Sequence, residues 1–289
     1  MAIQILSDEQ RRRYARFAGS PSPEQLARHF HLDIADQEII QTLRGDHNRL
    51  GFALMLCSAR FLGAFPDSET EVPKSVRVTL ARQIALEPNA PLSGYFGSRQ
   101  RERHLAAIQE SYGFSDFLTE GYARFRLARW LYALCWSGDD HPGPLIERGI
   151  SWLIANKVLL PGVTTLERFV GRIRDRARNR LWKRLVLGLN QDQRMRIAGL
   201  FDEAETSRFS ELDALRTAPT KRRPTEFLAH LDRLNAIRAF NLRPVSPKGV
   251  PAATLERLAR VARVGKPSAI AALQEPRKAD RILGSFGSA

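Results

Sequence analysis

The chain has 289 residues, of which 43% are hydrophobic and 26% charged, a composition typical of a globular protein rather than a disordered one. No segment approaches the ~20 consecutive apolar residues of a membrane-spanning helix. The positive charges near the first residue follow the apolar residues instead of preceding them, which excludes a secretory signal. We therefore expect a cytoplasmic protein with no membrane partner.

Charge is unevenly distributed along the chain, whose formal net charge is +14. Residues 1–160 carry 19 Lys and Arg against 18 Asp and Glu, residues 161–190 carry 8 against 2, and residues 191–289 carry 18 against 11. The positive excess thus lies after residue 160. A charge that served only solubility would be spread evenly, so this asymmetry favours a localised anionic partner.

The first part of the chain predicts a small helical bundle. Capping boxes formed by Ser7 with Gln10 and by Ser22 with Gln25 mark two helix starts. The expected helices span residues 7–18, 22–31, 33–45 and 46–62, and the last is so rich in large apolar residues that we expect it at the centre.

The middle of the chain predicts three further helices, at residues 73–86, 98–112 and 116–136, after a link rich in helix breakers at residues 63–73. The third is rich in aromatic residues. Rings at helical spacing usually pack in a core, and stacking on nucleobases is the alternative. Cys57 and Cys135 each lie in an apolar run, so we expect two buried thiols and no disulfide.

The stretch at residues 163–187 is the most informative part of the chain. Its apolar residues recur at helical spacing, and Thr164 with Glu167 has the pattern of a capping box. A shorter amphipathic helix precedes it at residues 144–155, and Pro161 and Gly162 interrupt the chain between the two. The order of helix, turn and capped helix is that of a helix-turn-helix unit, although this turn is longer than the usual three or four residues.

The surface of the second helix of this pair is expected to be almost wholly positive, because only Glu167 and Asp175 oppose its Arg and Lys residues. A solvated face is the plain alternative, but a face of one sign repels itself unless a polyanion lies beside it. The candidate DNA-binding residues, of which the first four would lie nearest the bases or phosphates, are Thr164, Thr165, Arg168, Arg172, Arg174, Arg176, Arg178, Arg180, Lys183 and Arg184.

The region after residue 190 is expected to be basic and helical, with helices at residues 191–204, 208–215, 225–240 and 251–264 and a disordered tail at 282–289. No strand is predicted. The fold class is therefore all-α, with two or three small helical lobes in series: an N-terminal bundle (1–66), a lobe with the helix-turn-helix-like pair at about 144–187 (72–190), and the C-terminal region (191–289). Residues 254–258 echo residues 165–169, a weak sign of an internal repeat.

Motifs that carry catalysis or hold a cofactor are not found. The chain has no phosphate-binding glycine loop, no Cys/His spacing of a metal site and no nucleophile elbow. Asp139, Asp140 and His141 form a compact group in a Pro- and Gly-rich loop, which we interpret as a polar turn rather than a metal site. We therefore assign no catalytic residue, no metal and no cofactor, and keep a nuclease that uses Asp139 and Asp140 as an alternative.

Three segments have a more specific pattern. They are Leu6-Ser7-Asp8-Glu9-Gln10-Arg11; Asn48-Arg49-Leu50-Gly51-Phe52-Ala53-Leu54 followed by Cys57, Arg60, Phe61, Leu62 and Gly63; and Leu159-Leu160-Pro161-Gly162-Val163-Thr164-Thr165-Leu166-Glu167-Arg168. In this order they resemble the N-terminal portion of transposases of the Tn-three family, the large enzymes of replicative, cointegrate-forming bacterial transposons. The resemblance covers about residues 5–275 and fades near Arg277.

The resemblance implies a helical region that binds the terminal inverted repeats of a transposon. In that family the carboxylates that cut and join DNA lie in a later ribonuclease-H-like domain, and none of them can be mapped onto this sequence. The resemblance therefore implies a DNA-binding region, truncated before the catalytic domain and without catalytic activity.

We accordingly expect sequence-specific binding of double-stranded DNA at transposon ends. Replacement of Arg168 and Arg172 should then weaken binding far more than replacement of Arg11 and Arg12. Two alternatives stay open. One is a regulatory fragment that pairs with itself or with a full-length transposase and inhibits it, and the other is a basic protein that binds DNA without sequence preference.

Overall fold

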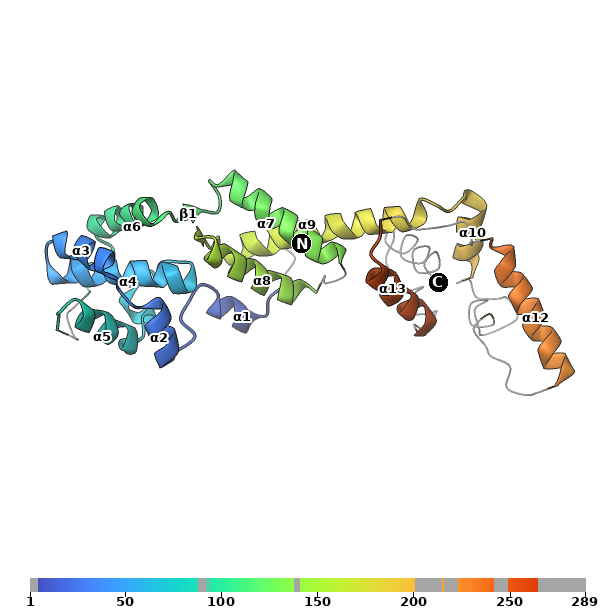
Figure 1. The fold of residues 1–289 in the computed structure, drawn as a ribbon, viewed down its shortest axis with the longest axis horizontal. Helices are drawn as coiled ribbons and strands as arrows, with labels where there is room; N and C mark the ends of the chain where they lie inside the picture. The colour runs from blue at the N-terminus through green and yellow to red at the C-terminus, as the bar shows by residue number, and fades with distance from the viewer. Residues whose placement is uncertain are drawn as a thin grey trace. The chain divides into compact units, whose positions relative to one another are not determined.

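The computed structural model describes residues 5–87, 92, 94–137, 141–200, 215, 223–241 and 249–264, with side chains as far as residue 260 (Figure 1). This described part is mostly helical, which confirms the predicted all-α class. The chain divides into two compact units, the first holding Met1–Leu131 and His141–Ile173 and the second holding Tyr132–Asp140 and Arg174–Ala289. The three predicted lobes stay a prediction.

Most elements belong to the first unit. These are α1 (Asp8–Arg13), α2 (Pro23–His29), α3 (Ile34–Thr42), α4 (Asp46–Leu62), the 3-10 helix η1 (Glu69–Glu71), α5 (Lys74–Gln83), α6 (Arg99–Tyr112), β1 (Ser115–Asp116), α8 (Pro142–Ala155) and β2 (Val158–Leu159). Helices α7 (Gly121–Trp136) and α9 (Val163–Val186) each have residues in both units, and the second unit adds α10 (Gln191–Gly199), α12 (Pro224–Ala239) and α13 (Ala252–Val264).

Several helix starts follow the sequence signals closely. The capping boxes at Ser7 and Ser22 are both present, and Asp33 caps α3 in the same way with the side chain of Asp36. The predicted bounds of α4 are exact. The expected helix at 208–215 and the tail at 282–289 lie outside the described residues, apart from Leu215.

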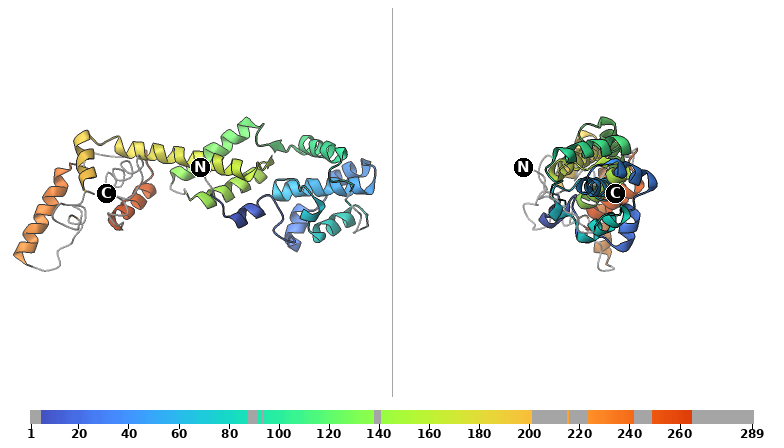
Figure 2. Two further views of the ribbon diagram at one scale, coloured as in Figure 1. Left: turned by 180° about the vertical axis from the view of Figure 1, so that it is seen from behind. Right: turned by 90° about the vertical axis from the view of Figure 1, so that its left-hand side faces the viewer.

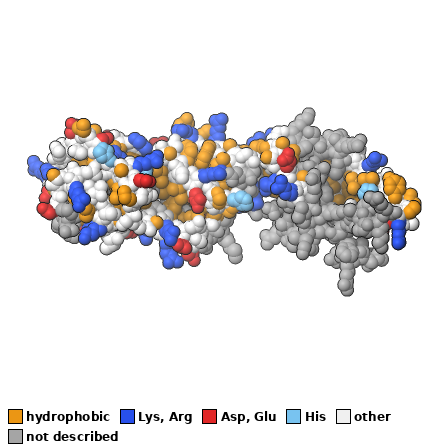
Figure 3. Space-filling model, turned by 60° about the horizontal axis from the view of Figure 1, so that its bottom comes forward, with side chains coloured by type: hydrophobic (Ala, Val, Ile, Leu, Met, Phe, Trp, Pro, Cys, Tyr) orange, Lys and Arg blue, Asp and Glu red, His pale blue; other side chains and the backbone are white. Residues whose placement is uncertain are grey.

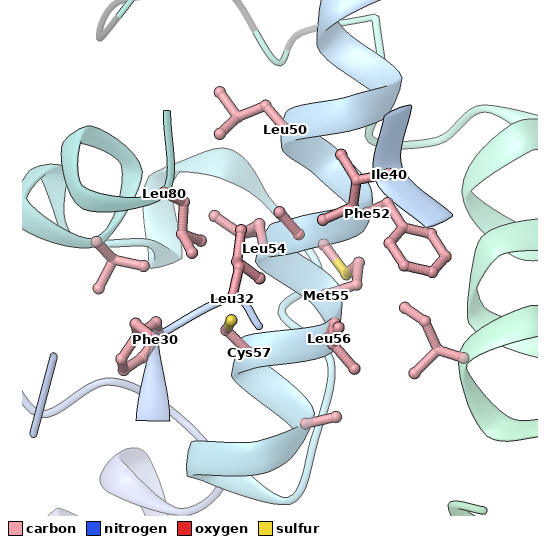
Figure 4. Close-up of a cluster of buried hydrophobic side chains, with 14 of the residues drawn as sticks. Phe30, Leu32, Ile40, Leu50, Phe52, Leu54, Met55, Leu56, Cys57 and Leu80 are labelled. Carbon is pink, nitrogen blue, oxygen red and sulfur yellow. The ribbon is translucent and has the colours of Figure 1, made fainter. Parts of the chain in front are cut away.

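Helix α4 is the centre of the core of the first unit, as predicted. It contacts α2, α3, α5, α6 and α8, and the first four can be followed around it in Figures 1 and 2. Every residue from 50 to 59 is buried, so the helix is enclosed around its whole circumference. Figure 4 shows its side chains meeting Phe30, Leu32 and Leu80 from neighbouring segments.

The two cysteines are free and buried, which confirms the expectation from their apolar surroundings. Burial raises the pKa of the Cys57 thiol to about 12. This thiol is therefore protonated at neutral pH, and it packs as a small apolar side chain.

The close approach of the Tyr95 ring to helix α4 explains Gly51 in the second family-like segment. A Cβ at this position would lie 2.6 Å from ring atoms of Tyr95, which is fully buried. The Tyr95 hydroxyl lies 3.1 Å from Nδ1 of His104, and Nε2 of Gln100 lies 3.0 Å from the other ring nitrogen. Burial lowers the pKa of His104, so the neutral imidazole is the form that fits.

A buried ion pair connects α3 to α4. The guanidinium of Arg60 donates one hydrogen bond to each carboxylate oxygen of Asp36, both 2.8 Å long, and the Asp36 side chain is 1% exposed. Burial alone would raise the pKa of Asp36, but the hydrogen bonds and the charge of Arg60 outweigh it and hold the pKa below its ordinary value.

Three predictions about secondary structure were wrong. Helix α1 ends at Arg13 rather than at residue 18, because the backbone turns at Tyr14 and takes a positive φ of 58° at Ala15. Helix α7 begins at Gly121 rather than at residue 116, because the Asp116 carboxylate accepts the N–H of Leu118 at 2.6 Å and forms a turn. Strands also exist: β1 and β2 pair in parallel, although each has only two residues.

Candidate nucleic-acid interface

Helix α9 presents one exposed and strongly positive face. Its members are Arg168, Arg172, Arg176, Arg180 and Lys183, all exposed, and we call this set the α9 basic face. At about 100° per residue, their positions fall within a sector of roughly 120° around the helix axis. Within the described part of the chain, none of the five has a hydrogen-bond or ion-pair partner.

The opposite side of α9 is buried, as the apolar spacing predicted. Leu166, Val170, Ala177, Leu181 and Leu185 are each at most 6% exposed. The helix is therefore held by its apolar side, and the basic face is left to solvent.

The remaining predicted DNA-binding residues are placed differently. Thr165 is exposed and lies in the same sector as the α9 basic face, whereas Thr164 is half-buried. Arg174, Arg178 and Arg184 are half-buried and each already has an interaction. The guanidinium of Arg184, for example, lies 5.8 Å from the ring centroid of Trp136.

The start of α9 differs from the predicted capping box. The helix begins at Val163, and the carbonyl of Gly162 accepts the N–H groups of Thr165 at 2.8 Å and Leu166 at 3.2 Å. Glu167 does not reach back to Thr164 and does not oppose the arginines at the surface, because its side chain is fully buried. Its carboxylate instead accepts the backbone N–H groups of Ile5 and Leu6 and pairs with Arg11.

Two more hydrogen bonds hold the chain just before α9. The N–H of Leu160 donates to the carbonyl of Gly63, 2.7 Å away, and Gly63 ends α4 with a positive φ of 68°. The hydroxyl of Tyr14 donates to the carbonyl of Pro161, also at 2.7 Å.

The three family-like segments therefore meet at the first turns of α9. Leu6 and Arg11 belong to the first segment, Gly63 to the second, and Leu160 and Glu167 to the third. They are far apart in the sequence, and only the fold of the first unit brings them together. The end of α9 that carries Arg168 and Arg172 is thus anchored from several directions.

The connection between α8 and α9 is more than a turn. It contains β2, which pairs with β1 in the register Ser115 to Val158 and Asp116 to Leu159. The N–H of Ser115 also donates to the carbonyl of Lys157. A helix-turn-helix function for this pair stays a prediction.

The second unit has a small core of its own around the later part of α9. Leu181, Trp182, Leu185 and Leu258 are buried together, with Trp136 packed against them. The sequence similarity between residues 254–258 and residues 165–169 is not matched by similar burial of the corresponding side chains. Thr254 is fully buried, whereas Thr165 is exposed, and Glu256 is exposed, whereas Glu167 is buried.

Three large apolar side chains at the start of α7 and in the turn before it are exposed. Leu118, Tyr122 and Phe125, which we call the α7 apolar patch, are 60%, 72% and 62% exposed. The guanidinium of Arg126 lies 5.9 Å from the ring centroid of Tyr122 and 5.5 Å from that of Trp152. The expectation that rings at helical spacing pack in a core was therefore wrong for Tyr122 and Phe125. Figure 3 shows apolar side chains at the surface of the first unit, among Lys and Arg side chains.

Other kinds of site find little support in the described residues. No group of three or more His, Cys, Asp or Glu side chains there is arranged to hold a metal ion. Asp139 and Asp140 lie outside the described residues. No helix among those described is long and apolar enough to cross a membrane.

This chain is similar to known transposases. It is 37% identical over 279 residues to the transposase for transposon gamma-delta of Escherichia coli (strain K12), a match that covers 96% of this chain and 28% of that protein. It is 29% identical to the transposase for transposon Tn1546 of Enterococcus faecium, covering 95% of this chain and 28% of that protein. The transposase for transposon Tn21 of Escherichia coli is 29% identical over 84% of this chain and 24% of its own length.

These matches define the class of protein. Over most of its length the chain is similar to the N-terminal part of transposases of the Tn-three family, which confirms the resemblance of the three segments. A family model described as "Domain of unknown function (DUF4158)" matches residues 5–173, and the chain belongs to that family. The chain spans about a quarter of the length of these relatives.

Proposed function

We propose that this chain binds double-stranded DNA sequence-specifically at the terminal inverted repeats of a transposon and does not itself cut or join DNA. The observation that carries the proposal is the α9 basic face, whose cationic side chains are exposed in one sector of a helix that is buried on its other side. A face of one sign without acidic partners suits a polyanion. The similarity to transposases supports DNA as that polyanion.

The two ends of the α9 basic face have different roles in this proposal. Arg176, Arg180 and Lys183 neutralise phosphates, and each phosphate contact releases counterions and steepens the salt dependence of binding by about 0.9 in log–log slope. Arg168 and Arg172, on the anchored first turns, contact base edges. A bidentate arginine–guanine pair is worth ~1–3 kcal/mol of discrimination, and it requires a side chain held in a fixed place.

The first experiment is an anisotropy titration of the wild-type chain. It compares a duplex that carries the inverted repeat of the host transposon with a scrambled duplex, at two salt concentrations. Preference for the repeat that persists at the higher salt concentration supports base readout. Equal and salt-sensitive binding to both duplexes would reduce the proposal to a basic protein without sequence preference.

The matched variants are Arg168→Ala with Arg172→Ala, and Arg44→Ala with Arg82→Ala as the control. Both control arginines are exposed and lie in the first unit, so each pair removes two surface charges. Arg11 is unsuitable as a control, because it pairs with the buried Glu167. The proposal requires the first pair to lose the preference for the repeat and the control pair to keep it.

The non-catalytic part of the proposal has a separate test. Incubation of the wild-type chain with plasmid DNA and Mg²⁺ should leave the DNA intact. Cleavage that disappears when Asp139 and Asp140 are both replaced by Asn would establish the nuclease alternative instead.

A second candidate function is a protein interaction, which the exposed α7 apolar patch favours. Exposed aromatic residues beside an arginine are typical of protein interfaces. We propose a full-length transposase as the partner in that case, because the chain is similar to the N-terminal part of transposases. Tyr122→Ser with Phe125→Ser should then abolish co-purification with the full-length enzyme and leave DNA binding intact. Unchanged co-purification would remove this candidate.

A further inference from the structure

A buried carboxylate lies at the start of the helix that carries the basic face. The Glu167 side chain is fully buried, and its Oε1 accepts the backbone N–H groups of Ile5 and Leu6, each at 2.9 Å. Its Oε2 pairs with the guanidinium of Arg11, whose side chain is 26% exposed. The partners are at least 156 residues away in the sequence, so this is a purely tertiary contact.

Such an arrangement is costly unless every part of it is present. Transfer of a carboxylate from water to a protein interior is unfavourable, and only its hydrogen bonds and its cation compensate for the loss of hydration. An apolar residue at this position would avoid that cost. The carboxylate instead favours one arrangement, in which the backbone of residues 5 and 6 and the side chain of Arg11 all lie against α9.

The same segment is held at its other end. The Tyr14 hydroxyl donates to the carbonyl of Pro161, two residues before α9 begins, and Leu6 is buried. Residues 5–14, which we call the clasp, are therefore fixed to the first turns of α9 at both ends. Arg168 follows Glu167 directly, and Arg172 lies a little over one turn further along.

We propose that Glu167 and Arg11 are positioning residues, which hold the clasp on α9 and thereby fix the direction in which Arg168 and Arg172 point toward DNA. This inference rests on the proposed DNA-binding function. Neither residue needs to touch DNA in this account. Their ion pair sets the geometry that base readout requires and adds little to the general attraction for phosphates.

The test uses the full chain with Arg11→Gln, Glu167→Gln and, as matched control, Arg13→Gln. Arg13 lies on the same helix and pairs with the exposed Glu9, so its loss removes the same charge without freeing a buried partner. Arg11→Gln should lower affinity for the repeat by about tenfold or more, the loss expected when a side chain no longer reaches its base. Binding to the scrambled duplex and the salt slope should change no more than in Arg13→Gln.

A second measurement separates positioning from mere stabilisation. Amide hydrogen exchange of residues 163–173 should become faster in Arg11→Gln under conditions where circular dichroism shows the chain fully folded. Arg11→Lys, which keeps the cation, should restore most of the protection and of the preference for the repeat. Glu167→Gln should behave like Arg11→Gln, and if it does not fold, Arg11→Gln still decides the question.

The possible results are distinct. Wild-type discrimination that survives unchanged in a folded Arg11→Gln would overturn the inference and leave the proposed function in place. If the wild-type chain does not discriminate between the duplexes, the proposed function fails, and hydrogen exchange still tests whether the clasp holds α9. Exchange at residues 163–173 that is equal in Arg11→Gln and wild type would then overturn the clasp itself.

Discussion

Replacement of Asp36 by Ala should destabilise the first unit strongly. The change removes the acceptor of two hydrogen bonds from Arg60 and also the group that accepts the N–H of Asp33 at 3.1 Å. Removal of one member of a buried ion pair typically costs about 3–5 kcal/mol, because the other charge is left without compensation. The Arg60 side chain is 28% exposed and can regain some water, so we expect about 2–3 kcal/mol.

The assay is urea unfolding followed by circular dichroism, at pH 7 and at lower pH. The pKa of Asp36 is lowered in the folded chain, so the ion pair contributes stability above the ordinary pKa of 3.8 and loses it as the pH falls through the lower, folded value. The difference in unfolding free energy between wild type and Asp36→Ala should therefore be constant from pH 7 to about pH 5 and shrink below pH 4.

A double variant controls for loss of packing. Asp36→Ala with Arg60→Met removes both charges, and it should be less destabilised than the sum of the two single variants. The reasoning would be refuted if the unfolding free energy of Asp36→Ala differed from that of wild type by no more than about 0.5 kcal/mol, the range of an ordinary surface substitution.

Three further predictions concern Gly51, His104 and the later part of the α9 basic face. Gly51→Ala should lose about 1–2 kcal/mol in urea unfolding, because its Cβ would collide with the buried Tyr95 ring and the gain in helix propensity only partly compensates. The unfolding free energy of wild type should fall as the pH drops below 6.5, since burial lowers the pKa of His104, and a His104→Gln variant should show a smaller fall. Arg176→Ala with Arg180→Ala should reduce the salt slope of DNA binding by about 1.8 and weaken binding to repeat and scrambled duplexes equally, as titrations of both would show.

Local signals in the sequence predicted local structure well. The capping boxes at Ser7 and Ser22 and the exact bounds of α4 depend on hydrogen bonds and apolar spacing within a few residues. The same holds for the buried stripe of α9. The separation of exposed from half-buried arginines on this helix also follows from the helical period, since Arg174 and Arg178 lie outside the sector that holds Arg168 and Arg172.

Features that depend on distant partners were not predicted. Glu167 has the sequence position of a capping residue, and nothing near it indicates that Arg11 and the N–H of Leu6 would be its partners. The pairing of β1 with β2 involves two residues on each side, too few for any periodicity. The exposure of Tyr122 and Phe125 depends on which neighbours cover α7, and a count of rings at helical spacing cannot give that.

The convergence of the three family-like segments gives their resemblance a physical basis. Each segment alone describes an ordinary piece of helix or turn, but each supplies a different part of one anchor: Arg11 pairs with Glu167, and the carbonyl of Gly63 accepts the N–H of Leu160. An anchor of this kind is complete only when all its parts occur in one chain, so the three segments form it together and none of them forms it alone. A helix that carries a same-sign basic face also has a particular need for such an anchor, because its charges repel one another and contribute nothing to holding it in place. The stability that orients Arg168 and Arg172 must therefore come from the buried side of α9 and from the clasp.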